Sequence, residues 1–159
     1  MFKTILYKIN DILDANSLIQ EVFKYEVEQF TGDPAAVIIP SSNESDYNTT
    51  QENVRIYAYT VRLFVNRNPK IRTKEKTDEV LMNLVDSVID DFDKYYTLSA
   101  TGTDGSSIPG GGIVNETGYT FINVFAVPSL WGYTEREDEY RVAEISVRCR
   151  VSVDLSNIS

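Results

Sequence analysis

The chain has 159 residues, 42% of them hydrophobic, and a formal net charge of −9. This length and composition suffice for one ordinary core without disulfide or metal cross-links, and they favour a single domain over residues 1–159. The acidic balance excludes a protein whose main task is to grip phosphates, because such proteins need a basic surface.

The residue types that are absent or rare also limit the chemistry. The sequence has no histidine, which is the commonest proton shuttle at neutral pH and the commonest metal ligand. Its single cysteine, Cys149, excludes an internal disulfide and a cysteine-based zinc cage. No apolar run approaches the roughly 20 residues that span a bilayer, and charges interrupt residues 1–11 too often for a secretion signal. We therefore expect synthesis in a cytoplasm-like compartment and predict no cofactor or metal.

Residues 2–13 carry apolar side chains at helical spacing, which predicts an amphipathic helix that ends near Asn16. A short strand is predicted at residues 19–25, and the proline-bounded apolar run at residues 35–40 suits a buried strand. Residues 41–53 are polar apart from Tyr47, so we expect an exposed loop that joins two strands of a hairpin. On the predicted helix at residues 2–13, four residues are expected to face outward: Lys3, Lys8, Asn10 and Asp11.

The middle of the chain predicts a strand, a helix and a loop. Side chains alternate over residues 54–65, which indicates a long central strand. Thr73 or Thr77 can cap a second helix, whose apolar residues recur at helical spacing up to Phe92. Residues 101–112 contain five of the eight glycines, so we predict a flexible loop without regular structure. This loop lacks the lysine and the following helix of a phosphate-binding loop.

Two strands are predicted in the last third of the chain. The first runs from Tyr119 to Val127 and is broken at Pro128. The second runs from Tyr140 to Leu155, and residues 131–139 form an acidic turn between them. The order of elements predicts an α+β fold, with a largely antiparallel mixed β-sheet and two α-helices packed on one face.

No motif nominates a catalytic residue. The acidic clusters at residues 90–93 and 135–139 lack the alternating carboxylates, the glycine bend and the distal glutamate of a calcium loop. A serine nucleophile would lack an activating histidine. We therefore predict that the protein is not an enzyme; a carboxylate- or metal-dependent hydrolase and an acidic inhibitor that mimics DNA are the less favoured alternatives.

The outward faces of the two long strands carry three arginines, Arg62, Arg148 and Arg150. A solvated sheet face is one interpretation of this pattern. The other is an interface with a partner, because arginine and tyrosine are enriched at interfaces and the chain has ten tyrosines.

The segment from Gly32 to Tyr59 resembles a stretch of the tail terminator (tail completion) proteins of long-tailed bacteriophages. The similar features are a proline-bounded strand, an Asn-Glu-Ser-Asp-Tyr loop at residues 43–47 and a long strand rich in aromatic residues. The order of the surrounding elements is also similar. The resemblance implies a structural subunit of the virion, located at the tail and neck, that forms a hexameric ring on the tail tube. Such a ring stops tube polymerisation and joins the tail to the head connector.

The resemblance further implies the partners of this chain: copies of itself, the tail tube protein and the head-tail connector protein. DNA would pass through the ring without specific binding. The net charge is compatible with this, because six chains at −9 each would repel phosphates wherever their acidic side chains line the bore. Another phage neck or head-completion protein is the nearest alternative. The glycine-rich residues 101–112 are not part of the resemblance. Seven residues are implied as contacts to a neighbouring subunit or to the tube: Asn43, Glu44, Asp46, Tyr47, Thr50, Asn53 and Arg55.

Overall fold

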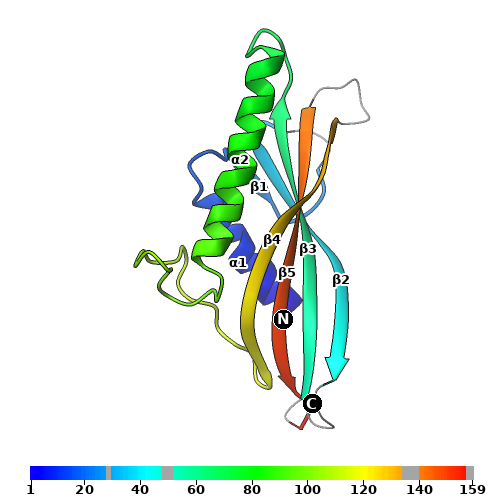
Figure 1. Cartoon of the computed structure of the whole chain (residues 1–159), viewed down its shortest axis with the longest axis vertical. Helices are drawn as coiled ribbons and strands as arrows, with labels where there is room; N and C mark the ends of the chain where they lie inside the picture. Colours follow the sequence, from blue (N-terminus) through cyan, green and yellow to red (C-terminus); the bar gives the residue numbers. More distant parts are fainter. Residues whose placement is uncertain (28–29, 48–51, 134–139, 157–159) are drawn as a thin grey trace.

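The computed structural model describes residues 1–27, 30–47, 52–133 and 140–156 (Figure 1). The strands form one five-stranded sheet in the order β1-β2-β3-β5-β4. β1 is parallel to β2, whereas the pairs β2–β3, β3–β5 and β4–β5 are antiparallel. This arrangement confirms the predicted α+β fold with a mixed, largely antiparallel sheet. The elements are α1 (Phe2–Asp14), β1 (Glu21–Phe23), β2 (Ala35–Tyr47), β3 (Glu52–Asn66), α2 (Lys74–Lys94), β4 (Tyr119–Tyr133) and β5 (Tyr140–Asp154).

Both helices pack on one face of the sheet, as predicted. α1 contacts β1 and β2, whereas α2 contacts β3, β4 and β5 (Figure 1). The buried sides of the two helices and the inward residues of the central strands form one hydrophobic core. The predicted alternation of the two long strands is confirmed by these buried residues: Tyr57, Tyr59, Val61, Leu63 and Val65 of β3, and Ala143, Ile145, Val147, Cys149, Val151 and Val153 of β5.

Lys8 of α1 lies inside the molecule, so the prediction that it faces outward is wrong. Its side chain is 5% exposed. The ammonium group donates hydrogen bonds to the carbonyl oxygens of Pro109, at 2.7 Å, and Gly111. The spacing of apolar residues in α1 does not indicate that Lys8 is buried, because the segment that covers Lys8 is the glycine-rich region far along the chain.

The residues expected to form the loop at 41–53 belong largely to strands. β2 continues to Tyr47, β3 begins at Glu52, and the two pair up to the Tyr47–Asn53 position. Main-chain hydrogen bonds between β2 and β3 hold this polar end of the hairpin together. Its sequence therefore lacks the alternation of apolar and polar residues that would indicate strands. The prediction of a loop is therefore wrong for residues 41–47 and 52–53. Residues 48–51 lie outside the described residues.

Pro128 does not break its strand. β4 continues to Tyr133 through a register shift between Pro128 and Leu130. β4 is the edge strand of the sheet, and a proline is tolerated there because no further strand needs its missing N–H group. Residues 131–133 are therefore strand residues rather than part of the expected turn, and residues 134–139 lie outside the described part of the chain.

The glycine-rich residues 101–112 form no helix or strand, as predicted, apart from an isolated bridge between Thr101 and Ser107. Ile108 is 4% exposed and joins the core. Its N–H group donates to the carbonyl oxygen of Ala100 at 2.9 Å. The flexibility of this loop stays a prediction, but several contacts attach it to the rest of the domain. Ile108 packs in the core, Lys8 donates to two of its carbonyl oxygens, and the Tyr95 hydroxyl bonds to Ser106 and Ser107.

Thr73 is the N-cap of α2. The backbone N–H group of Lys76 donates to the Thr73 hydroxyl at 3.2 Å, whereas the Thr77 hydroxyl donates to the Thr73 carbonyl oxygen. We expect Thr73→Ala to lower the free energy of unfolding by about 1 kcal/mol, because an N–H group at the helix start loses its acceptor. Urea unfolding followed by circular dichroism measures the loss. Thr73→Ser keeps the acceptor and should unfold close to the wild type; equal stability of the alanine variant would contradict the capping role.

Cys149 is fully buried in β5, and burial raises the pKa of its thiol well above the ordinary value. Since the thiolate is the reactive species, we expect a thiol reagent to label the folded protein at least about 1,000-fold more slowly than the denatured protein. Labelling with and without urea measures the ratio. Rapid labelling of the folded chain would show that β5 opens locally, contrary to its place in the core.

Candidate interaction surface

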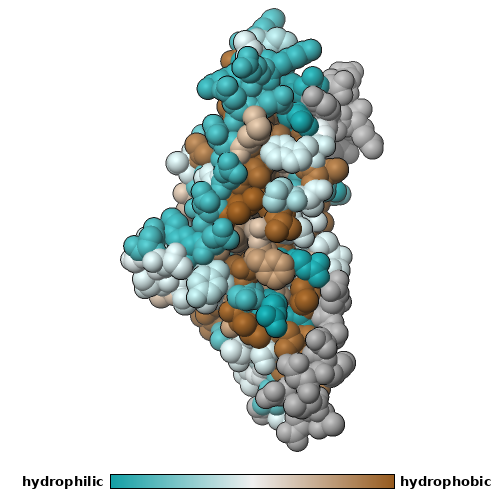
Figure 2. Space-filling model, viewed as in Figure 1, coloured by the Kyte–Doolittle hydropathy of each residue, from teal (hydrophilic) through white to brown (hydrophobic). Residues whose placement is uncertain are grey.

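The two helices leave the opposite face of the sheet uncovered by any described helix. Three apolar side chains of β4 are exposed on this face: Phe125 at 41%, Val127 at 49% and Leu130 at 53%. Figure 2 shows hydrophobic side chains gathered along the middle of the molecule on this side. We define the open face by seven residues: Ile56, Arg62, Phe125, Val127, Leu130, Arg148 and Arg150.

The strand register places the arginines of β5 among apolar neighbours. Phe125 is directly opposite Arg148 on one side, and Ala58 is opposite it on the other. Arg150 is opposite Ile56 of β3 and the polar Asn123 of β4. Directly opposite side chains have Cβ atoms about 4.5–5.5 Å apart, so the aliphatic parts of the arginine side chains lie next to these apolar residues. Aromatic residues and arginines in such proximity are typical of the centre of protein interfaces.

The three predicted arginines differ in their interactions within the chain and in their exposure. Arg62 pairs with Glu144, Nε to Oε1 at 2.8 Å, and with Glu26, Nη1 to Oε1 at 3.0 Å. Arg148 is partly buried and also interacts within the chain. Arg150 is the exposed member of the set. Arg62 is therefore already paired within the subunit, and Arg150 is the most accessible to a partner.

The residues implied by the resemblance lie on one hairpin, with one exception. Thr50 lies outside the described residues. Register brings the backbone of the hairpin close to the β5 arginines, since Ile56 lies between the Glu44 position of β2 and Arg150 of β5. The hairpin and the arginine end of the open face thus share one end of the sheet. The β2 positions are Asn43, Glu44, Asp46 and Tyr47, and the β3 positions are Asn53 and Arg55.

Asn53 is buried within the subunit, and Arg55 interacts with side chains of the same subunit. Asn53 is 0% exposed, and its amide has no hydrogen-bond partner among the described residues. The Arg55 guanidinium lies 5.8 Å from the centre of the Tyr119 ring. A hydrogen bond with the Tyr57 side chain is the main cause of a raised pKa of Arg55. Neither side chain belongs to the open face.

The comparisons with known proteins give a likeness of fold. No protein-family model and no curated protein matches the sequence. Among solved structures, a similar chain comes from the virion of a native gene transfer agent (GTA) particle. The TM-score is 0.58 at 8% sequence identity, and the match covers 93% of this chain and 94% of that chain. The chain shares its fold with a chain of a virion. The likeness extends over the whole α+β domain rather than over one substructure.

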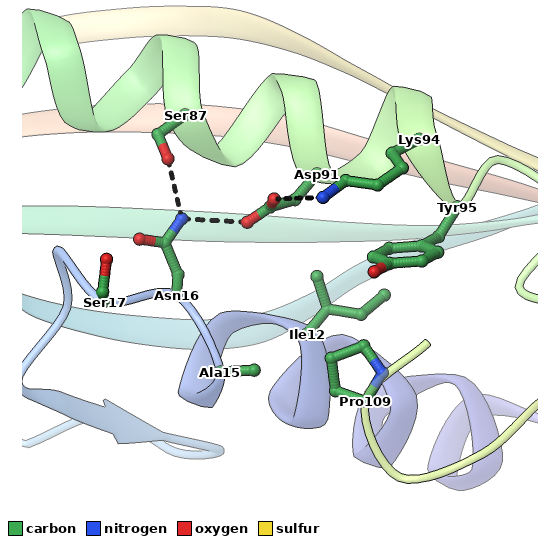
Figure 3. A pocket seen from close by; sticks show the side chains of 9 residues that line it. All are labelled: Ile12, Ala15, Asn16, Ser17, Ser87, Asp91, Lys94, Tyr95 and Pro109. Atoms are coloured by element: carbon green, nitrogen blue, oxygen red, sulfur yellow. Dashed lines mark hydrogen bonds and ion pairs between the residues drawn. The ribbon is translucent and has the colours of Figure 1, made fainter. Parts of the chain in front are cut away.

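A cavity of about 230 Å³ lies between the end of α1 and α2 (Figure 3). The Asn16 amide Nδ2 donates to Ser87 Oγ at 3.0 Å and to Asp91 Oδ2 at 2.9 Å. Lys94 Nζ lies 4.0 Å from Asp91 Oδ1, and burial raises the pKa of the Asp91 carboxyl. Asn16 is thus bonded to two α2 residues that line the cavity, Ser87 and Asp91, and this connects the end of α1 to α2. Sequence reasoning placed Asn16 at the helix end but missed this link.

The acidic clusters do not form a metal site in the described ranges. No group of three or more His, Cys, Asp or Glu side chains there could hold a metal ion. Asp90 and Asp93 are exposed, whereas Asp91 turns toward Asn16, so the three carboxylates do not converge. The cluster at residues 135–139 lies outside the described residues. No described helix is both long and apolar enough to cross a bilayer.

Proposed function

We propose that this chain is a structural subunit of a phage or phage-like virion and serves as its tail terminator. The observation that carries the proposal is the open face, on a fold shared over nearly the full length of a virion chain. The sequence resemblance of the segment from Gly32 to Tyr59 to tail terminators supports the same assignment.

The proposed mechanism is assembly by surface fit, with no bond made or broken. Six copies form a ring on the last ring of the tail tube, occupy the surface to which the next tube subunit would add, and present a new surface to the head connector. A closed ring needs a heterologous interface, in which one face of a subunit meets a different face of the next. Burial of the exposed apolar side chains of β4 would stabilise such a contact by about 25 cal/mol for each Å² removed from water.

The charge of the chain suits a ring through which DNA moves. Six chains at −9 each carry a large negative charge, which disfavours binding of phosphates along the bore. In this proposal the polar end of the β2–β3 hairpin, with Asn43, Glu44, Asp46 and Tyr47, meets a neighbouring subunit or the tube. The protein would be made in the host cytoplasm and retained at the tail and neck of the virion.

Electron microscopy of the purified chain, alone and mixed with tail tubes, tests the proposal. We expect six-fold rings on tube ends and no further growth of capped tubes when tube protein is added. Binding to connectors but not to tubes would instead favour another neck or head-completion protein. A chain that stays monomeric, ignores tube ends and hydrolyses a substrate with a divalent ion would overturn the proposal.

A further inference from the structure

We infer that the open face of one subunit binds the outer side of α2 of the next copy in the ring. This inference rests on the proposed ring function and specifies the interface that closes the ring. It assigns both halves of the contact to described residues.

The outer side of α2 carries a row of exposed aspartates. Met82, Asp86, Asp90 and Asp93 are all exposed. They follow one another at intervals of four, four and three residues, so they lie along one side of the helix. We call these four residues the outer stripe.

The outer stripe is electrostatically unfavourable in the isolated subunit. Neighbouring like charges at these spacings repel, and Asp93, in the last turn of α2, also faces the negative end of the helix dipole. Lys94 lies near other carboxylates, 4.0 Å from Asp91 and 3.8 Å from Asp104. In the described part of the chain, Asp86, Asp90 and Asp93 form no ion pair. Cationic groups from outside the subunit would relieve this repulsion.

The open face supplies groups complementary to the stripe. Arg150 is exposed, and Arg148 lies beside it on the same face of β5. Guanidinium groups form short, charge-assisted hydrogen bonds with carboxylates. Phe125 and its apolar neighbours on β4 match the exposed Met82, because a flexible thioether packs well against an aromatic ring. The charged groups and the apolar groups of the two surfaces therefore match in the same contact.

The positions of the two surfaces suit the head-to-tail contact that a closed ring requires. α2 lies on one side of the sheet and the open face on the other, so the contact is head to tail and repeats from copy to copy. Pairing through strand edges is less favourable. β4 has register shifts at 121/123 and 128/130, and β2 has one at 40/42; Pro128 and Pro40 lie at two of these shifts. Bulges and prolines of this kind discourage edge pairing.

Two single-surface variants test the inference. Arg148→Glu/Arg150→Glu makes the open face acidic, and Asp86→Arg/Asp90→Arg makes the outer stripe basic. Each variant alone juxtaposes like charges, so we expect assembly to need at least about a hundredfold higher concentration than for the wild type. Native mass spectrometry and sedimentation velocity measure the assembly state. Because Arg148 also interacts within its own chain, Arg150→Glu alone serves as a milder second variant.

Mixing the two variants gives the decisive measurement. In an alternating ring, the acidic face of one variant meets the basic stripe of the other, and the two unmodified surfaces meet each other. We therefore expect an equimolar mixture to form rings that contain three copies of each variant, although neither variant assembles alone. The two masses differ, so mass spectrometry reports the composition directly.

Controls separate this inference from the proposed function. Lys70→Glu and Asp14→Arg change the charge at exposed positions outside both surfaces and should assemble like the wild type. Circular dichroism checks that each variant is folded. Rings from both single-surface variants, or a folded mixture that stays monomeric, would overturn the interface but leave the ring function intact. A wild-type chain that never assembles would overturn the proposed ring function itself.

Discussion

Phe125→Asp is expected to prevent ring assembly at concentrations at which the wild-type chain is fully assembled. Phe125 is 41% exposed at the centre of the open face, and buried aromatic residues carry a large share of the energy of protein interfaces. A carboxylate at this position would have to be desolvated in the contact. We expect a loss of about 2–4 kcal/mol of association free energy, or roughly a 30- to 1,000-fold weaker assembly. Sedimentation velocity over a concentration series measures this change.

The same substitution should leave the subunit folded. The side chain lies outside the hydrophobic core, and the new carboxylate would stand directly opposite Arg148. Surface changes of this kind usually alter stability by less than about 0.5 kcal/mol. Val114→Asp is the matched control, because Val114 is 78% exposed in the connection before β4. Normal rings from Phe125→Asp would show that the open face is not an assembly surface.

The parts of the fold that could be predicted are those in which burial has a regular period. α1, α2, β3 and β5 each bury one side, so their apolar residues recur at the spacing of a helix or a strand. The outer half of the β2–β3 hairpin has no such period, since main-chain pairing holds it. Its polar residues indicate a loop as readily as a strand, and only the register with β3 and β5 decides between them.

The candidate surface could be predicted only in part. Alternation along β3 and β5 placed the three arginines on one face, and the register confirms this. The apolar residues of β4 were missed, although a signal was present. Phe121, Val124 and Ala126 of that strand are buried, yet Phe125 and Val127, which follow Val124 and Ala126, are apolar as well. A strand that is apolar on both faces is typical of a sheet covered on both faces. The described part of the chain covers only one face of the sheet, which agrees with a second cover from outside.

Lys8→Met is expected to lower the free energy of unfolding by about 2–4 kcal/mol. The buried ammonium group donates to the carbonyl oxygens of Pro109 and Gly111 and lies 3.3 Å from Asp11 Oδ2. Methionine keeps much of the packing volume but leaves both carbonyl oxygens without this donor, at a cost of roughly 1–3 kcal/mol each. Urea unfolding of the variant measures the loss. Lys3→Met, on the exposed side of the same helix, should cost less than about 0.5 kcal/mol.

Hydrogen exchange tells whether Lys8 acts through the glycine-rich segment. The N–H groups of Ile108 and Ile113 donate to Ala100 and Leu98, so these two amides report on the order of the segment. If Lys8 attaches the segment to α1, both amides should exchange faster in Lys8→Met while the amides of β3 and β5 change only with global stability. Unchanged protection together with unchanged stability would mean that the other contacts of the segment, Ile108 in the core and the hydrogen bonds of Tyr95, hold it without Lys8. If these two amides already exchange rapidly in the wild-type protein, the segment is the flexible loop that its glycines predict. Lys8 would then restrain only the carbonyl groups that it contacts.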